Sequence, residues 1–161
     1  MIELFARSQG MREAVSLAER VSSTDANVLI TGESGAGKDL LASYIHLKSK
    51  RSAHPFVKID CATLPGELLE AELFGFERGA FTGAVEAKAG RFEAADKGTV
   101  VLDEIAHLST DAQAKLLRVI ERREFERLRA AHPLHRAVLH EALRLDVAAD
   151  AGGEVVGDTG G

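Results

Sequence analysis

Apolar residues in the first 128 positions occur either in short continuous runs or at helical spacing. Short runs rich in β-branched and aliphatic residues, which are typical of buried parallel strands, lie at 28–30, 56–59 and 99–102. Apolar residues at helical spacing lie at 9–21, 39–48, 66–73 and 111–122. In the last of these helices, Thr110 and Gln113 have the spacing of a capping box. Strands that alternate with helices predict an α/β sandwich with a parallel sheet.

A glycine-rich loop joins the first strand to the helix that follows it. Its residues are Gly32, Glu33, Ser34, Gly35, Ala36, Gly37, Lys38 and Asp39. The order of strand, loop and helix is the context of a phosphate-binding loop, or Walker A motif. Glycines let backbone N–H groups turn towards phosphates, and the helix N-terminus adds a positive end. The loop therefore predicts binding of ATP or a related nucleotide, with Lys38 reaching the β- and γ-phosphates.

Two acidic positions complete the predicted nucleotide site. Asp39 stands where the general pattern has a hydroxyl residue on Mg²⁺, and a carboxylate suits that ion because magnesium prefers oxygen ligands. The strand at 99–102 runs into Asp103 and Glu104, a Walker B arrangement at the strand end where ligands bind in open α/β sheets. We expect Asp103 to organise Mg²⁺ together with Asp39. We expect Glu104 to orient and polarise the attacking water.

A loop of small residues around one aromatic and one hydroxyl lies between the two nucleotide motifs. Its residues are Gly79, Ala80, Phe81, Thr82, Gly83 and Ala84. A flexible loop that carries an aromatic is a poor structural element but a reasonable contact surface. For such a loop elsewhere, a glycine-rich turn with Phe81 folded inward would be the better interpretation. The neighbouring motifs favour the contact surface here.

These motifs resemble the AAA+ domain of the sigma-54 interacting bacterial transcription activators. The resemblance covers residues 8–128 and is carried by the segments GESGAGKD, ELFGFERGAFTGA, GRFEAADKGTVVLDEI and DAQAKLLRVIERREFERL. It implies a three-layer P-loop NTPase core that uses ATP and Mg²⁺, with Asp103 and Glu104 in the hydrolytic site. It also implies a ring, usually a hexamer, that hydrolyses ATP at subunit interfaces. The loop at 79–84 would then press on sigma-54 RNA polymerase and remodel the closed promoter complex.

One position departs from the family pattern inside the core. The family usually has Asn at the position of Asp60, where that residue senses the nucleotide state and holds the catalytic glutamate. A carboxylate cannot donate the amide hydrogen bond, and two ionised carboxylates repel unless a cation or proton bridges them. We expect this change to affect the coupling of hydrolysis to the loop rather than nucleotide binding.

The resemblance stops after Leu128. The family continues with a strand ending in an Ala-Thr-Asn sensor, then arginine fingers and a helical lid domain, and none of these is recognisable in residues 129–161. We therefore expect an incomplete core at 1–128, no lid, and an atypical tail at 129–161 that is either genuine or frameshifted. A run of Leu134, Val138, Leu139, Leu143 and Leu145 predicts an amphipathic helix after Pro133. The low apolar content and the many glycines of residues 150–161 predict disorder there.

Composition limits the partners and the setting. A length of 161 residues suits one domain. A net charge of −5 argues against DNA binding by this chain alone, because DNA-binding domains usually have a basic face. The chain has no apolar run that would span a membrane and no signal peptide. Cys61 is the single cysteine, so no intrachain disulfide can form. We expect a cytoplasmic protein without direct DNA binding.

Two functional hypotheses stay open. The chain is either an ATPase that assembles into a ring and activates sigma-54 polymerase, or a truncated module that binds nucleotide with little or no hydrolysis. We favour an ATP-binding sigma-54 interaction domain as its identity, and the second hypothesis for its own activity, because fingers and lid are not recognisable. A P-loop kinase or GTPase would explain residues 32–39 alone. It leaves residues 79–84 unexplained, and the chain lacks an N-K-x-D guanine motif.

Overall fold

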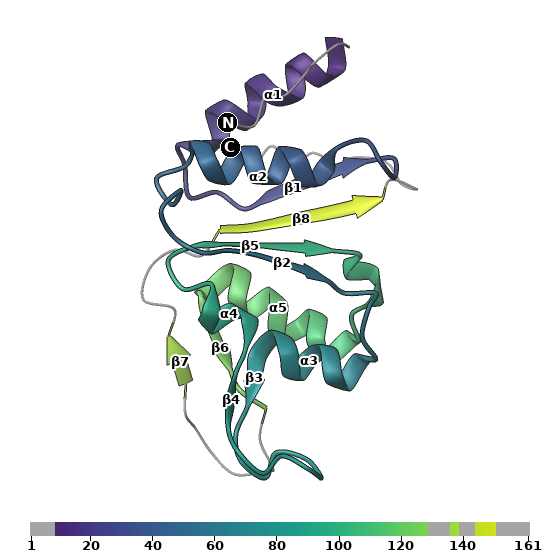
Figure 1. Cartoon of the computed structure of the whole chain (residues 1–161), viewed down its shortest axis with the longest axis vertical. Helices are drawn as coiled ribbons and strands as arrows, with labels where there is room; N and C mark the ends of the chain where they lie inside the picture. The colour runs from purple at the N-terminus through teal and green to yellow at the C-terminus, as the bar shows by residue number, and fades with distance from the viewer. Residues whose placement is uncertain (1–8, 129–135, 139–143, 151–161) are drawn as a thin grey trace.

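The centre of the molecule is a sheet of parallel strands. The computed structural model describes residues 9–128, 136–138 and 144–150. Within them the main sheet has four strands (Figure 1), in the spatial order β1 (Val28–Gly32), β8 (Arg144–Asp150), β5 (Thr99–Asp103) and β2 (Phe56–Asp60). All neighbouring pairs are parallel, so the carboxyl ends of the strands lie at one edge of the sheet. We call this edge, together with the loop at 32–39, the nucleotide edge.

Helices cover both faces of the sheet, as the alternation along β5 shows. Val101 packs on one side with Ile30 and with Ala42 and Ile45 of α2. Val100 and Leu102 belong to the other core, which the remaining helices cover. The first layer contains α1 (Gln9–Ser22) and α2 (Lys38–Lys48), and the second contains α3 (Gly66–Phe74), α4 (Arg91–Ala94) and α5 (Thr110–Arg122). The predicted three-layer α/β sandwich with a parallel sheet is confirmed.

The predicted helices and strands of the core begin and end within two residues of those observed. The predicted capping box of α5 is wrong by one residue. Ser109 is the N-cap, because its Oγ accepts the backbone N–H of Ala112 at 3.1 Å. Thr110 is the first helical residue, and the side chain of Gln113 donates to the Leu108 carbonyl at 3.0 Å.

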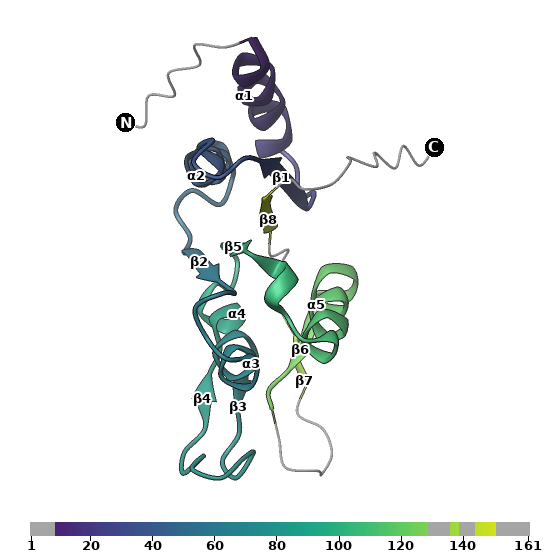
Figure 2. The same ribbon diagram turned by 90° about the vertical axis from the view of Figure 1, so that its right-hand side faces the viewer.

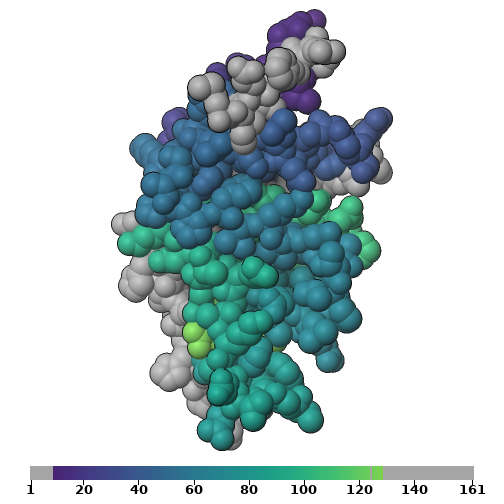
Figure 3. Space-filling view, viewed as in Figure 1, coloured from purple at the N-terminus to yellow at the C-terminus, as the bar shows by residue number. Residues whose placement is uncertain are grey.

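A short hairpin leaves the second helical layer and extends away from the sheet. It consists of β3 (Gly75–Phe76) and β4 (Lys88–Ala89), which are antiparallel (Figure 2). Gly75 has φ 75°, and a Cβ at this residue would stand 2.5 Å from the Lys88 carbonyl oxygen. The strands can approach this closely only because Gly75 has no side chain. Figure 3 shows the hairpin at the end of the molecule opposite α1.

The predicted helix after Pro133 is wrong wherever the structure describes it. β7 (Arg136–Val138) pairs antiparallel with β6 (Glu124–Glu126), and β8 lies between β1 and β5. Pairing with β8 satisfies the facing backbone groups of both neighbouring strands, and this need overrides a local helical pattern. The disorder predicted from residue 150 onwards is wrong at Asp150, which is the last residue of β8. Leu134, Leu139, Leu143 and residues 151–161 lie outside the described residues, so the predictions for them stay predictions.

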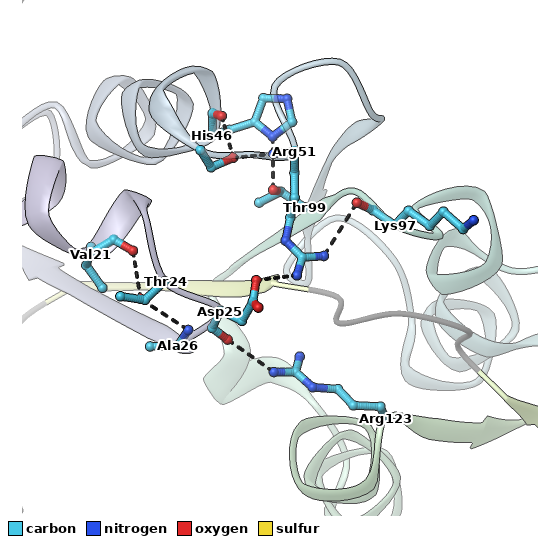
Figure 4. Close-up of polar contacts among 10 residues, drawn as sticks. Val21, Thr24, Asp25, Ala26, His46, Arg51, Lys97, Thr99 and Arg123 are labelled. Atoms are coloured by element: carbon cyan, nitrogen blue, oxygen red, sulfur yellow. Dashed lines mark hydrogen bonds and ion pairs between the residues drawn. The ribbon is translucent and has the colours of Figure 1, made fainter.

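Polar contacts join the layers at the amino-terminal edge of the sheet (Figure 4). His46 Nδ1 lies 2.9 Å from Thr99 Oγ1, and both residues are buried. Arg51 donates to the Asp25 carboxylate at 2.6 Å, and Arg123 donates to the Asp25 carbonyl at 3.3 Å. The hydrogen bond from Arg51 lowers the pKa of Asp25. No helix in the described part of the chain is long and apolar enough to cross a membrane.

Candidate nucleotide site and contact loop

The loop at 32–39 has the backbone conformation that its glycines allow. Gly35 and Gly37 have φ of 77° and 87°, in the left-handed region, and Gly37 is the N-cap of α2. Lys38 Nζ donates to the carbonyl oxygens of Gly32 at 2.8 Å and Glu33 at 3.1 Å. The ammonium group therefore lies back over its own loop, beside the N-terminus of α2.

Three of the four parallel strands end in aspartate at the nucleotide edge. β2 ends at Asp60, β5 at Asp103 and β8 at Asp150, while β1 ends at Gly32. The register pairs Asp60 with Asp103 and Gly32 with Asp150. The sequence analysis did not propose Asp150. The apolar residues Leu145 and Val147, two positions apart and therefore on one face of a strand, were the signal for this strand.

Lys58 on β2 joins the two predicted magnesium ligands. Its Nζ donates to Asp39 Oδ2 at 2.5 Å and lies 3.7 Å from Asp103 Oδ2. The hydrogen bond to Asp39 raises the pKa of Lys58, and the charges of Asp39, Asp103 and Asp60 act in the same direction against the effect of burial. Lys58 is thus a cation placed between two carboxylates. The sequence analysis missed it, although a lysine two residues before Asp60 lies on the same face of the strand.

The donor set around Lys58 suits magnesium. Asp39 and Asp103 already converge on one cation, and Mg²⁺ is typically bound by one or two carboxylates plus substrate phosphates. Among residues 9–128, 136–138 and 144–150, no three His, Cys, Asp or Glu side chains are arranged to hold a metal ion by themselves. A magnesium site here would therefore include the phosphates of the nucleotide.

The other two predicted switch and catalytic residues lie beside this pair. Glu104 has φ 54°, and its N–H donates to Asp103 Oδ1 at 3.0 Å. Its half-exposed carboxylate lies 3.8 Å from His107 Nε2 in η1 (Ile105–His107). Asp60 Oδ1 accepts the N–H of Ala62 at 2.9 Å, which ties this carboxylate to the turn after β2.

The loop at 79–84, which we call the contact loop, forms the tip of the β3–β4 hairpin region. Gly79 N–H donates to the Ala84 carbonyl at 2.8 Å, and Ala84 N–H donates to Phe81 at 3.0 Å. The Phe81 ring meets Phe76 edge-on, with centroids 4.9 Å apart, yet 43% of Phe81 stays exposed. The loop is therefore folded by its own backbone and presents part of an aromatic ring to solvent.

The base of the contact loop is held by the two residues that follow β6 (Glu124–Glu126) in the sequence. Arg127 donates to both carboxylate oxygens of Glu93 at 2.7 Å and to Glu77 at 3.2 Å. The Glu77 N–H donates to the Leu128 carbonyl at 2.9 Å, and the Leu128 N–H donates to Gly75 at 2.9 Å. Arg127 and Leu128 thus hold the start of the hairpin in place.

A family model described as the sigma-54 interaction domain matches residues 4–141. This chain belongs to that family. The chain is 52% identical over 124 residues to the response regulator protein FleR of Pseudomonas aeruginosa, covering 77% of this chain and 26% of FleR. It is 56% identical over 118 residues to the Nif-specific regulatory protein of Azotobacter vinelandii, covering 73% of this chain and 23% of that protein. The chain thus spans about a quarter of the length of these relatives.

Solved structures agree with the fold. NtrX from Brucella abortus in complex with ATP matches with a TM-score of 0.80 and 35% identity, over 94% of this chain and 31% of NtrX. The P-loop NTPase domain of the sigma-54 transport activator from E. coli matches with a TM-score of 0.52 and 20% identity, over 85% of this chain and 84% of that domain. The predicted AAA+ P-loop core and the family resemblance are confirmed.

Proposed function

We propose that this domain binds ATP with Mg²⁺ at the nucleotide edge and couples its hydrolysis to remodelling of sigma-54 RNA polymerase. The observation that carries the proposal is the convergence of Asp39 and Asp103 on one cation, at the sheet edge where the lysine-bearing loop also lies. The chain belongs to the sigma-54 interaction domain family, and NtrX, a structural match, was solved with ATP and with ADP.

The residues that the sequence analysis predicted for the nucleotide site each have a role in this proposal. Lys38 exchanges its two carbonyl partners for phosphate oxygens, and backbone N–H groups of residues 32–39 surround the phosphates. Asp39 and Asp103 hold the ion, which when bound neutralises charge on the phosphates. Glu104 takes the proton of the attacking water. Asp60, at the end of β2, responds to the state of the nucleotide.

The contact loop supplies the surface for sigma-54. Phe81 is partly exposed, and Gly79, Ala80, Thr82, Gly83 and Ala84 make up the rest of the loop. In this proposal the domain acts in the cytoplasm as part of a ring of subunits, the hexamer of the family, and this chain itself makes no direct DNA contact. The alternative from the sequence remains: a chain that holds nucleotide with little or no hydrolysis, because residues 129–161 carry no pattern for arginine fingers.

Calorimetric titration with the non-hydrolysable ATP analogue AMP-PNP in Mg²⁺ tests the nucleotide part. The wild-type chain should bind, and Lys38→Ala should abolish binding because the phosphates lose the positive charge borne by the loop. Lys115→Ala, which removes a lysine from α5, is the matched control and should bind normally. Equal affinity of the wild type and Lys38→Ala would disprove the nucleotide assignment.

Capture of purified sigma-54 in the presence of ATP and a transition-state analogue tests the contact loop. Phe81→Ala and Thr82→Ala should each abolish capture while AMP-PNP binding stays unchanged, because the loop lies outside the phosphate motif. Val85→Ala is the control: Val85 is 76% exposed and follows the loop directly. Loss of nucleotide binding in the two loop variants would instead give the loop a structural role.

A further inference from the structure

Lys58 lies at the nucleotide edge but belongs neither to the phosphate-binding loop at 32–39 nor to the acidic pair Asp103 and Glu104. It lies in β2, and its ammonium group reaches across to Asp39 at the start of α2 and to Asp103 at the end of β5. The side chains of Lys58 and Asp39 are 39% and 59% exposed, whereas that of Asp103 is 24% exposed. A single movable cation therefore connects three elements at the nucleotide edge.

We propose that Lys58 is a built-in counter-ion that holds the Asp39 and Asp103 carboxylates together without metal and competes with Mg²⁺ for them. Lys58 thereby sets how strongly nucleotide binding depends on magnesium. This inference rests on the proposed nucleotide function and adds to it a residue that determines the magnesium requirement.

Electrostatics gives the reason for competition. Two carboxylates directed at one point repel each other unless a cation lies between them. The ammonium group of lysine is a compact charge on a flexible four-carbon stem, so it fills this role and can also leave. Lys58 and a divalent ion cannot share the same carboxylate oxygens, because two cations at such a distance repel strongly. The exposed side of Lys58 gives it a path into solvent when the ion is bound.

Loss of the Lys58 charge should change nucleotide binding in opposite directions without and with magnesium, and both changes raise the dependence of binding on the ion. Without magnesium, Asp39 and Asp103 stand uncompensated beside the triphosphate, so nucleotide binding weakens. With magnesium, the ion no longer displaces a competing ammonium group, so binding strengthens. The ratio of the AMP-PNP dissociation constant in EDTA to that in Mg²⁺ therefore rises. We expect a rise of about two- to fivefold, as for removal of one partly exposed ion pair.

The experiment measures this ratio by calorimetry for three variants and the wild type. Lys58→Met, which keeps the length of the stem, should raise the ratio, and Lys58→Arg, which keeps the charge, should retain the wild-type value. Lys115→Met is the matched control, because Lys115 is 36% exposed and is also paired with a carboxylate, that of Glu70. It should leave the ratio unchanged. An unchanged ratio in Lys58→Met, with AMP-PNP binding intact, would overturn the inference and leave the nucleotide assignment standing.

A second measurement does not depend on nucleotide at all. Millimolar Mg²⁺ alone should raise the melting temperature of Lys58→Met slightly more than that of the wild type. Asp39 and Asp103 are then unpaired and offer the ion two carboxylates, although nucleotide phosphates would be needed to complete the site. An equal response of both proteins would count against Lys58 as a competitor. Absence of AMP-PNP binding by the wild type in either buffer would instead refute the proposed function, and the inference with it.

Discussion

The nucleotide edge and the contact loop lie in different parts of the molecule and are built in different ways. At the nucleotide edge, the ends of β2 and β5 hold charged side chains, and Lys58 balances Asp39 and Asp103. The contact loop has no such framework: it is closed by its own backbone hydrogen bonds and one pair of aromatic rings. The positions of the side chains at the nucleotide edge are set by the strands of the sheet, whereas the conformation of the contact loop is set by contacts between residues close in sequence.

This difference separates what each region can do. Strand ends fix charges relative to one another, which suits the binding of a polyanion and an ion. A hairpin tip with left-handed glycines at Gly79 and Gly83 can change shape at low cost, which suits a moving contact surface. The Arg127 side chain contacts Glu93 and Glu77 at the base of the hairpin, away from the nucleotide edge, so variants in each region should affect one property and spare the other.

The largest expected effect concerns turnover at the nucleotide edge. Under the alternative of a chain that holds nucleotide with little hydrolysis, the isolated chain should bind ATP yet hydrolyse it roughly a thousandfold or more slowly than a complete activator domain. The reason is that residues 129–161 carry no recognisable arginine-finger pattern, and such a finger contributes about this factor to phosphoryl transfer. Turnover measured over a range of protein concentrations should show no cooperative rise. A concentration-dependent ATPase that is lost in Glu104→Gln, together with ring formation in light scattering, would contradict this prediction.

The next effect concerns the core that supports the contact loop. Phe92 is fully buried, and its ring lies 5.5 Å from Phe74 and 6.0 Å from Phe125. Phe74 precedes β3 and Phe92 follows β4, so this pair closes the base of the hairpin. Phe92→Ala should lower the free energy of unfolding by about 3–5 kcal/mol in urea denaturation, because it leaves a cavity. Leu117→Ala, at a position 51% exposed on α5, is the control and should cost far less.

Local motifs were predictable from the sequence, and long-range partners were not. The order of strand, loop and helix around Lys38 and the acidic end at Asp103 follow from short patterns, as do the four longer helices α1, α2, α3 and α5, whereas the single turn of α4 was not predicted. β8 was missed because its strand conformation depends on β1 and β5. Lys58 was missed because its partners come from two other elements. Sequence periodicity reports which face a residue is on, but it does not report which charge lies opposite.

A smaller effect is expected where Arg127, which follows β6, holds the base of the contact loop. Arg127→Met keeps the apolar stem and removes the hydrogen bonds to Glu93 and Glu77. The free energy of unfolding should fall by about 1–2 kcal/mol, as for a paired, partly exposed guanidinium group. Amide hydrogen exchange at Glu77 and Leu128 should become faster, while AMP-PNP binding stays unchanged. Arg122→Met, on the exposed end of α5, is the control. Unchanged exchange at both amides would show that the backbone bonds alone hold the loop base.

The smallest effect lies between α3 and α5, away from both regions. Lys115 and Ser109 donate to Glu70 at 2.6 and 2.7 Å. Burial raises the pKa of Glu70, but these hydrogen bonds outweigh it, so the pKa lies below its usual value. The pair therefore stabilises the fold above the ordinary glutamate pKa, and its contribution is lost as the pH falls through the lowered value. Glu70→Gln should cost under about 1 kcal/mol at pH 7. In urea denaturation the difference from the wild type should shrink as the pH falls towards 3, and a difference that stays constant from pH 7 to pH 3 would exclude this charge effect.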